Sequence, residues 1–178
     1  MDGAIFYASR YGSTARYARW ISEACRLPAF DAFNTDADPA RYDFLVVGSA
    51  VIYHRLPIGR WVERQHERIR DIPLILFTVS GAPPGPQLDR WIADSLPADV
   101  VARARHVPLR GRQDPKELGW RDRLMLIVGG LKNPDPVASR EELHGFDYMD
   151  RSSIDAVVTL VERLRHPEAP PVLRVVHG

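Results

Sequence analysis

A short polar loop between an apolar run and a helical pattern is the feature that most limits how this chain can fold. Residues 3–8 are largely apolar, residues 9–14 carry hydroxyl groups and a glycine, and residues 15–25 follow a helical pattern. The first N–H groups of a helix have no partner within it and lie at the positive end of its dipole, so such a junction binds anions. We therefore predict a phosphate-monoester site at this loop. Its expected residues are Ser9, Arg10, Tyr11, Gly12, Ser13 and Thr14.

The loop differs from two common phosphate-binding motifs. The sequence contains neither GxxxxGK[ST] nor GxGxxG in this region. Its pattern, S-x-x-G-x-T, resembles the FMN-phosphate loop of flavodoxins, [ST]-x-[ST]-G-x-T, with Tyr11 where flavodoxins often carry threonine. The resemblance implies FMN as the cofactor. Hydroxyl and glycine residues also occur before helices simply as caps, and this alternative stays open.

Strand and helix patterns alternate along the chain. We expect strands at residues 3–8, 29–33, 44–48 and 73–79, and a fifth strand within residues 100–109 after a short helix end. We expect helices at residues 13–26, 57–69, 87–95 and 152–164. This alternation predicts an α/β protein with a flavodoxin-like, doubly wound parallel five-stranded sheet of order 2-1-3-4-5. We expect a single domain over residues 1–178, with a long insert after strand five, at about residues 111–150.

Composition and charge restrict the classes of function. The chain has 24 Lys and Arg against 23 Asp and Glu, a net charge of +1, which does not favour a nucleic-acid partner. This balance also differs from the strongly acidic composition typical of electron-carrying flavodoxins. Cys25 is the one cysteine, which excludes an internal disulfide, and the histidines show no metal-ligand spacing. We therefore expect no bound metal. Because we find no signal-peptide pattern and no apolar stretch that could span a bilayer, we also expect a cytoplasmic protein.

Two further loops are expected to complete a flavin site, because they follow strands three and four at the same edge of the sheet. Tyr53, in the first of them, could stack on the isoalloxazine ring, although a structural role is an equal alternative. His54 is a candidate substrate contact, again with a structural role as the alternative. The expected cofactor residues are Ser49, Ala50, Val51, Ile52 and Tyr53 in the first loop, and Thr78, Val79, Ser80 and Gly81 in the second.

Several motifs extend the resemblance over nearly the whole chain. They are residues 8–14, residues 48–53, residues 118–125 (Leu-Gly-Trp-Arg-Asp-Arg-Leu-Met), the Gly-Gly pair at 129–130 and Asp-Tyr-Met-Asp at 147–150. Together they resemble the menaquinone-dependent, oxygen-independent protoporphyrinogen dehydrogenases, which have a flavodoxin fold. The resemblance implies an FMN-dependent oxidoreductase of heme biosynthesis that oxidises a porphyrinogen and passes electrons to a quinone or another acceptor. The chain departs from the family pattern at 111–113 and 131–142, where the specialised substrate should bind.

The insert is where we expect the choice of substrate and acceptor to be made, because long loops beside a ligand edge often carry function. Trp120, Arg121 and Arg123 are candidate substrate contacts, since an aromatic ring among cations suits a large planar or carboxylated molecule. Two alternatives stay open. The apolar residues near Trp120 could form only the core of the insert, or they could make peripheral contact with the inner face of a membrane.

Two other classes of protein compete with the oxidoreductase. One is a flavodoxin-like carrier that shuttles single electrons between protein partners. The near-neutral charge and the long insert disfavour it. The other is a binding module that keeps the fold and has lost the flavin, which Tyr11 and the altered insert keep open. A yellow purified protein would exclude the last, and the number of electrons taken up in each reduction step would separate the first two.

Overall fold

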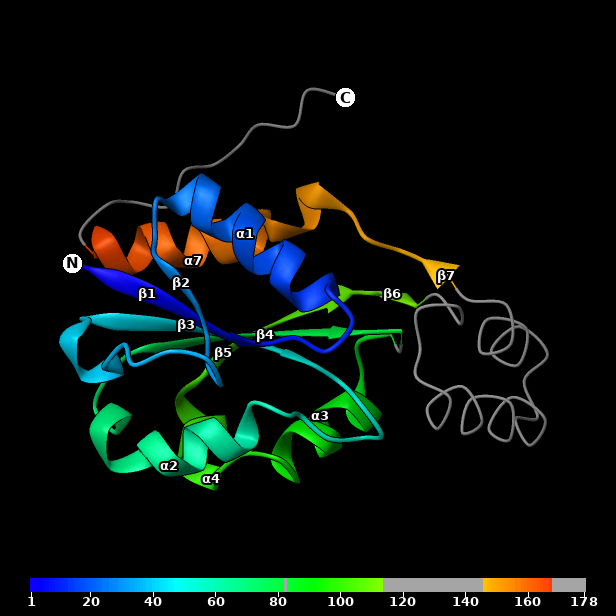
Figure 1. The fold of residues 1–178 in the computed structure, drawn as a ribbon, viewed down its shortest axis with the longest axis horizontal. Coiled ribbons are helices and arrows are strands. Elements are labelled where there is room, and N and C mark those ends of the chain that lie inside the picture. The colour runs from blue at the N-terminus through cyan, green and yellow to red at the C-terminus, as the bar shows by residue number, and fades with distance from the viewer. Residues whose placement is uncertain (82, 114–145, 168–178) are drawn as a thin grey trace.

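A five-stranded parallel sheet forms the centre of the computed structural model, which describes residues 1–81, 83–113 and 146–167 (Figure 1). The strand order is β2-β1-β3-β4-β5, so the predicted doubly wound topology is confirmed. The strands are β1 (Gly3–Ala8), β2 (Ala29–Asp31), β3 (Phe44–Ala50), β4 (Leu74–Ser80) and β5 (Arg105–Arg110).

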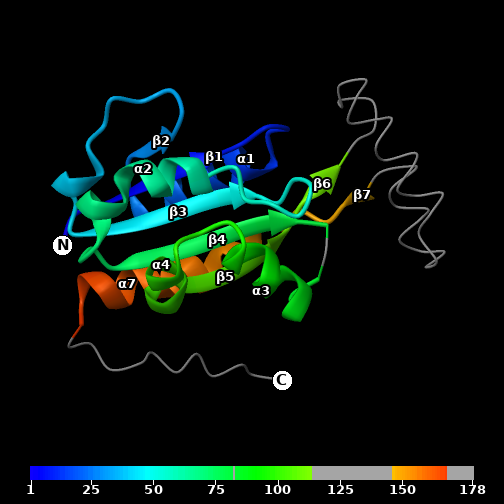
Figure 2. The same cartoon turned by 90° about the horizontal axis from the view of Figure 1, so that it is seen from below.

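Helices cover both faces of this sheet, which explains why its central strands are apolar at nearly every position. Figure 1 shows α1 and α7 on one face and α2, α3 and α4 on the other, and Figure 2 shows the same layers from below. The helices are α1 (Ser13–Cys25), α2 (Gly59–Ile69), α3 (Pro86–Ala93), α4 (Ala98–Arg103) and α7 (Asp155–Arg165). Two 3-10 turns, η1 (Pro39–Arg41) and η2 (Arg151–Ile154), complete the described elements of this layer structure.

Alternate residues of each strand divide the core into two halves. Phe6 and Leu76 face α2, where Phe6 stacks on Trp61 with a ring separation of 4.8 Å. Phe77, the next residue along β4, faces α1 and α7. Cys25 is 4% exposed on that second side, and burial raises the pKa of its thiol to about 11, so it is a small apolar core residue.

Several element boundaries differ from the predicted ones. The second strand ends at Asp31 instead of Phe33, and α2 begins at Gly59 instead of Pro57. Gly59, the first residue of α2, lies against the turn that follows α3. A Cβ atom at Gly59 would be only 2.3 Å from the carbonyl oxygen of Ser95. The periodicity of the sequence gives no sign of this contact, because Gly59 and Ser95 are far apart in the chain.

Two short strands were not predicted. They are β6 (Arg112–Gln113) and β7 (Phe146–Asp147), and they pair antiparallel, with Gln113 opposite Phe146. Strands of two residues are too short to show a hydrophobic period in the sequence. We call this pair the stem, because it holds together the two ends of residues 114–145, which lie outside the described residues.

No helix in the described part of the chain combines the length and the apolar character needed to cross a membrane.

Candidate functional site

The loop between β1 and α1 ends in a glycine with a left-handed backbone conformation, directly before the helix. Gly12 precedes the helix with φ +85°, in the left-handed region that L side chains rarely adopt. Its carbonyl oxygen accepts the first helical hydrogen bond, from the N–H of Arg16, at 2.9 Å. The first turn of α1 contains no acidic residue, so no carboxylate neutralises the positive end of the helix dipole.

Two hydroxyl groups at this loop are buried without a partner. Ser9 Oγ and Thr14 Oγ1 are both shielded from solvent, and neither has a hydrogen-bond partner among the described residues. A buried polar group that is left unsatisfied costs about 1–3 kcal/mol, so it needs an explanation. Phosphate oxygens accept hydrogen bonds and hydroxyls donate them, so a bound phosphate group would satisfy both atoms.

The Ser13 side chain connects the loop to the stem. Its hydroxyl donates a hydrogen bond to the carbonyl oxygen of Arg112 in β6, at 3.2 Å. A contact between the Ser13 hydroxyl and a phosphate stays a prediction. The backbone N–H of Ser13 remains in the first turn of α1. Of the two residues before Gly12, Arg10 is exposed, and its guanidinium lies 5.4 Å from the centre of the Tyr11 ring.

The loop after β3 is held in place by buried hydrogen bonds. The Ser49 hydroxyl donates to the carbonyl of Ala50 at 2.9 Å and accepts from the N–H of Ile58 at 3.4 Å. Val51 N–H bonds to the carbonyl of Val79 at 2.9 Å, which links this loop to β4. Ser49 thus stabilises the loop internally, and a direct contact between its side chain and a flavin stays a prediction.

A tight turn at the tip of this loop displays the predicted aromatic residue. Ile52 and Arg55 exchange two backbone hydrogen bonds of 2.9 and 3.0 Å, and Tyr53 and His54 between them have φ +49° and +62°. Left-handed conformations of non-glycine residues are strained and gather at functional sites. Tyr53 is 52% exposed, which leaves its ring accessible to a planar ligand. His54 instead stacks on Trp91 of α3 at 4.7 Å, so the structure gives it a packing contact.

The loop after β4 begins later than predicted, because β4 continues through Ser80. Thr78 is fully buried, and its Oγ1 lies 2.8 Å from Nε2 of His106. Val79 is 4% exposed in the core. The side chains of both residues therefore pack within the sheet, and contact of the backbone from Thr78 to Gly81 with a flavin stays a prediction.

The stem contacts two of the three predicted cofactor loops. A Cβ atom at Gly81 would lie 2.5 Å from the Phe146 ring, so β7 packs directly against the end of β4. The Ser13–Arg112 hydrogen bond joins β6 to the phosphate loop. Sequence reasoning missed these contacts, since only the motif at 147–150 gave any signal there. Trp120, Arg121 and Arg123 lie outside the described residues, so their predicted substrate role stays a prediction.

A strap formed by residues 146–150 fixes the stem to the domain. The guanidinium of Arg110 lies 4.3 Å from the centre of the Tyr148 ring, and Tyr148 N–H bonds to the carbonyl of Gly111 at 3.1 Å. The Tyr17 hydroxyl donates to the carbonyl of Arg110 at 2.8 Å and accepts from the N–H of Asp150 at 3.2 Å. The position of the stem is therefore determined by α1 and β5.

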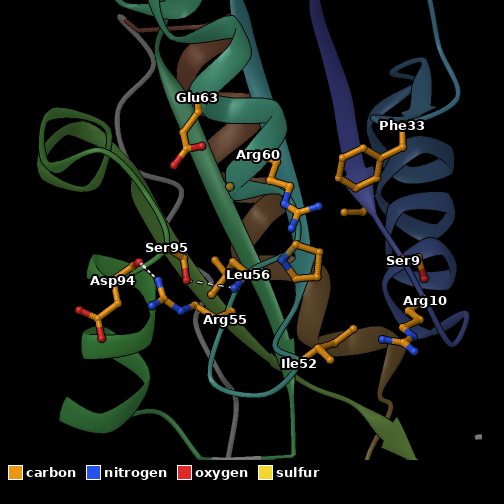
Figure 3. A pocket seen from close by; sticks show the side chains of 13 residues that line it. Ser9, Arg10, Phe33, Ile52, Arg55, Leu56, Arg60, Glu63, Asp94 and Ser95 are labelled. Atoms are coloured by element: carbon orange, nitrogen blue, oxygen red, sulfur yellow. Dashed lines mark hydrogen bonds between the residues drawn. The ribbon is translucent and has the colours of Figure 1, made fainter. Parts of the chain in front are cut away.

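A cleft of about 870 Å³ lies beside the phosphate loop, on the face of the sheet that α2 covers (Figure 3). Its lining comes from the end of β1 and the loop after it, the connection after β2, the loop after β3, the start of α2 and the residues after α3. They are Ala8, Ser9, Arg10, Phe33, Ile52, Arg55, Leu56, Pro57, Gly59, Arg60, Glu63, Asp94 and Ser95. Within the described residues, no group of three or more His, Cys, Asp or Glu side chains could hold a metal ion.

The family of the chain follows from a comparison of its sequence with models of protein families. Residues 4–128 match the flavodoxin domain. The chain belongs to the flavodoxin domain family. This agrees with the strand order of the sheet.

Similar solved structures include a WrbA-like flavodoxin from Agrobacterium tumefaciens, with 13% identity over 91% of this chain and 98% of that chain and a TM-score of 0.48. A flavodoxin from the domain Archaea has 14% identity over 93% and 100%, with a TM-score of 0.47. A flavoprotein in complex with FMN from Lactobacillus acidophilus has 15% identity over 61% and 91%, with a TM-score of 0.45. Similarities this low assign neither a function nor a site to this chain. No curated protein matches the chain in sequence.

The burial of His106 predicts a pH dependence of stability. Burial lowers the pKa of His106 from the ordinary value of 6.5, so the folded protein resists its protonation while the unfolded chain does not. The unfolded state therefore binds more protons below about pH 6.5, and stability should fall as the pH falls from 6.5 toward the lower, folded-state pKa.

We expect His106→Gln, which cannot titrate, to show a smaller loss of urea midpoint between about pH 7.5 and pH 5.5 than the unmodified protein. His166→Gln, at an exposed histidine after α7, serves as the control. Equal slopes in the His106→Gln variant and the unmodified protein would contradict the prediction.

Proposed function

We propose that this protein is an FMN-dependent oxidoreductase. The observation that carries the proposal is the pair of buried hydroxyl oxygens near the start of α1, Ser9 Oγ and Thr14 Oγ1, which have no hydrogen-bond partner among the residues that the structure describes. Membership of the flavodoxin domain family and the S-x-x-G-x-T pattern support the same ligand. A terminal phosphate monoester suits this loop because a helix N-terminus offers several N–H donors to one anionic group.

The described residues account for how such a cofactor would be held. Ser9 and Thr14 donate to phosphate oxygens, together with the N–H groups of the first turn of α1. Tyr53, displayed on its tight turn, offers an exposed ring, and Gly81 offers backbone at the end of β4. A bound flavin supplies hydride and electron transfer at its ring, while the protein supplies placement and electrostatics.

The substrate part of the proposal rests on the motif resemblance. We propose that a porphyrinogen or a similar organic molecule gives electrons to the flavin and that a quinone or another acceptor receives them. The resemblance at residues 118–125 supports this, and so does the stem, because it holds both ends of the insert against the cofactor loops. The cytoplasmic location, and contact of the insert with a membrane surface, are parts of the same proposal.

A comparison of flavins that differ in their phosphate groups tests the cofactor. The flavin-free protein is titrated with FMN, with riboflavin, which lacks the phosphate, and with FAD, in which an anhydride bond joins the phosphate to a second phosphate, so that it is no longer a terminal group. We expect one FMN per chain and binding of riboflavin at least about a hundredfold weaker, because several charge-assisted hydrogen bonds are lost. Equal affinity for FMN and riboflavin, or no flavin binding at all, would refute the assignment. Accumulation of a one-electron-reduced form on titration with dithionite would favour the electron carrier over the oxidoreductase.

A further inference from the structure

The cleft beside the phosphate loop is a feature that flavin binding does not explain. Its lining shares Ser9, Arg10 and Ile52 with the predicted flavin loops, but it includes no residue from Tyr11 to Thr14 and none from Thr78 to Gly81. It lies instead toward β2 and α2. An occupant of the cleft would therefore sit next to a bound flavin, without taking its place.

The path of the chain between β2 and β3 accounts for an opening here. Parallel strands are usually joined through an α-helix that covers the sheet. This connection starts at the cleft with Phe33, and its described secondary structure is the 3-10 turn η1 (Pro39–Arg41). The side chain of Phe33 is 48% exposed, so an aromatic surface remains at the edge of the cleft.

The charged side chains that line the cleft are unevenly arranged. Arg55 donates a hydrogen bond to the carbonyl of Asp94, which draws its guanidinium toward α3. Arg60 has no hydrogen bond or ion pair with any residue that the structure describes. Figure 3 shows the guanidinium of Arg60 on the side of Phe33 and Ser9, with the carboxylates of Glu63 and Asp94 on the other side. The half of the cleft nearest Ser9 thus carries two cations, Arg10 and Arg60, and no lining carboxylate.

The apolar surface of this half complements its charge. Phe33 contributes an aromatic ring, and Ile52 and Pro57 add apolar contacts between it and the turn at the tip of the loop. Arg64, one turn after Arg60, places its guanidinium 5.9 Å from the centre of the Phe33 ring, which adds further positive charge. A volume of about 870 Å³ lies within the range of small-molecule sites. These properties suit a flat ring that carries an anionic group.

We propose that this cleft binds a planar aromatic carboxylate, the small-molecule partner of the proposed oxidoreductase, with Arg60 and Arg10 contacting the carboxylate and Phe33 contacting the ring. Guanidinium groups bind carboxylates through paired, parallel hydrogen bonds and also pack on flat rings, so one set of residues recognises both parts of the molecule. The proposal deepens the proposed function and rests on it for the link to the flavin, whereas binding in the cleft needs no flavin.

A matched pair of probes separates charge recognition from general apolar binding. Naphthalene-2-carboxylate and naphthalene-2-carboxamide have nearly the same shape and differ in charge. Both are titrated by calorimetry into the flavin-free protein and into the FMN-loaded protein. We expect the carboxylate to bind about tenfold more tightly than the amide in both forms, as a charge-assisted hydrogen bond in a partly open cleft predicts.

Variants then assign this preference to the cleft. Arg60→Gln should remove most of the tenfold preference, and Arg10→Gln combined with it should remove the rest. Phe33→Ala should weaken both probes alike. Arg19→Gln is the control, because it removes the same charge from the exposed surface of α1 on the opposite face. FMN affinity should be unchanged in the Arg60→Gln and Arg19→Gln variants.

The outcomes separate this proposal from the proposed function. Equal binding of the two probes to the unmodified protein, or a preference that survives in the Arg10→Gln, Arg60→Gln double variant, would overturn it. Loss of carboxylate binding when FMN is loaded would also overturn it, because the cleft would then belong to the flavin site. If the protein binds no FMN, the proposed function fails, while the flavin-free titration still decides whether the cleft recognises the carboxylate.

Discussion

Replacing Ser9 with alanine and Thr14 with valine should lower FMN affinity by at least about a hundredfold. Each change removes one buried hydroxyl that we expect to donate to a phosphate oxygen, and hydrogen bonds to charged groups contribute about 1.5–3 kcal/mol each. The same double variant should be more stable than the unmodified protein when flavin is absent. The double variant removes two buried oxygens that have no partners among the described residues. Each such oxygen destabilises the folded state by about 1–3 kcal/mol, so its removal should raise the free energy of unfolding. Fluorescence titration with FMN and urea unfolding of the flavin-free protein measure the two effects.

The opposite signs of these two effects make the test specific. A variant that merely damages the fold would lose both affinity and stability. Thr159→Val is the matched control, because Thr159 is an exposed threonine on α7. Ser13→Ala should reduce affinity much less than the double variant, since its hydroxyl donates to the carbonyl of Arg112. Unchanged FMN affinity in the double variant would show that the phosphate binds elsewhere.

Closing the stem with a two-residue turn should sharply lower turnover and leave the cofactor bound. Gln113 and Phe146 lie opposite each other in the antiparallel pair, so replacing residues 114–145 with Asn-Gly would make a hairpin. The contacts of Ser13 with Arg112 and of Gly81 with Phe146 would remain. We expect FMN affinity within a few-fold of the unmodified protein, and oxidation of protoporphyrinogen with menadione as acceptor to fall by roughly a hundredfold or more, because groups that position the substrate are lost.

The measurements on this variant are FMN affinity, melting temperature and turnover, made on one preparation. A parallel loss of all three would show that residues 114–145 support the end of the sheet and do not select the substrate. Full turnover in the closed variant would place substrate and acceptor contacts entirely in the described part of the chain. A Trp120→Ala variant of the full chain should reproduce part of the loss in turnover with a normal melting temperature.

The sheet could be predicted because its signals are local. Continuous apolar runs at β1, β3 and β4 indicate strands that are covered on both faces, and helical patterns between them require parallel crossovers. The start of α2 was predicted two residues too early, at Pro57, because proline is common in the first turn of a helix. The stem was missed because two residues in each strand are too few to show a period.

In the candidate site, too, local sequence signals could be predicted and contacts between distant residues could not. The loop from Ser9 to Thr14 was predicted because its glycine and hydroxyls directly precede a helix. The sequence could not distinguish Ser13 from Thr14, although only the Thr14 hydroxyl is left without a partner among the described residues. Thr78 was predicted both as a strand residue and as a cofactor contact, and only the tertiary structure shows that its side chain is buried against His106.

The sequence by itself determined the order of strands and helices along the chain and the place of the glycine-bearing loop between β1 and α1, because hydrophobic period and the conformational freedom of glycine are local signals. The tertiary structure decided which polar atoms in that loop are available. The Ser13 hydroxyl is engaged by a carbonyl 99 residues away in the chain. It also decided that Arg10, Phe33 and Arg60 line one cleft, since they come from three separate segments that only the packing of α2 on the sheet brings together.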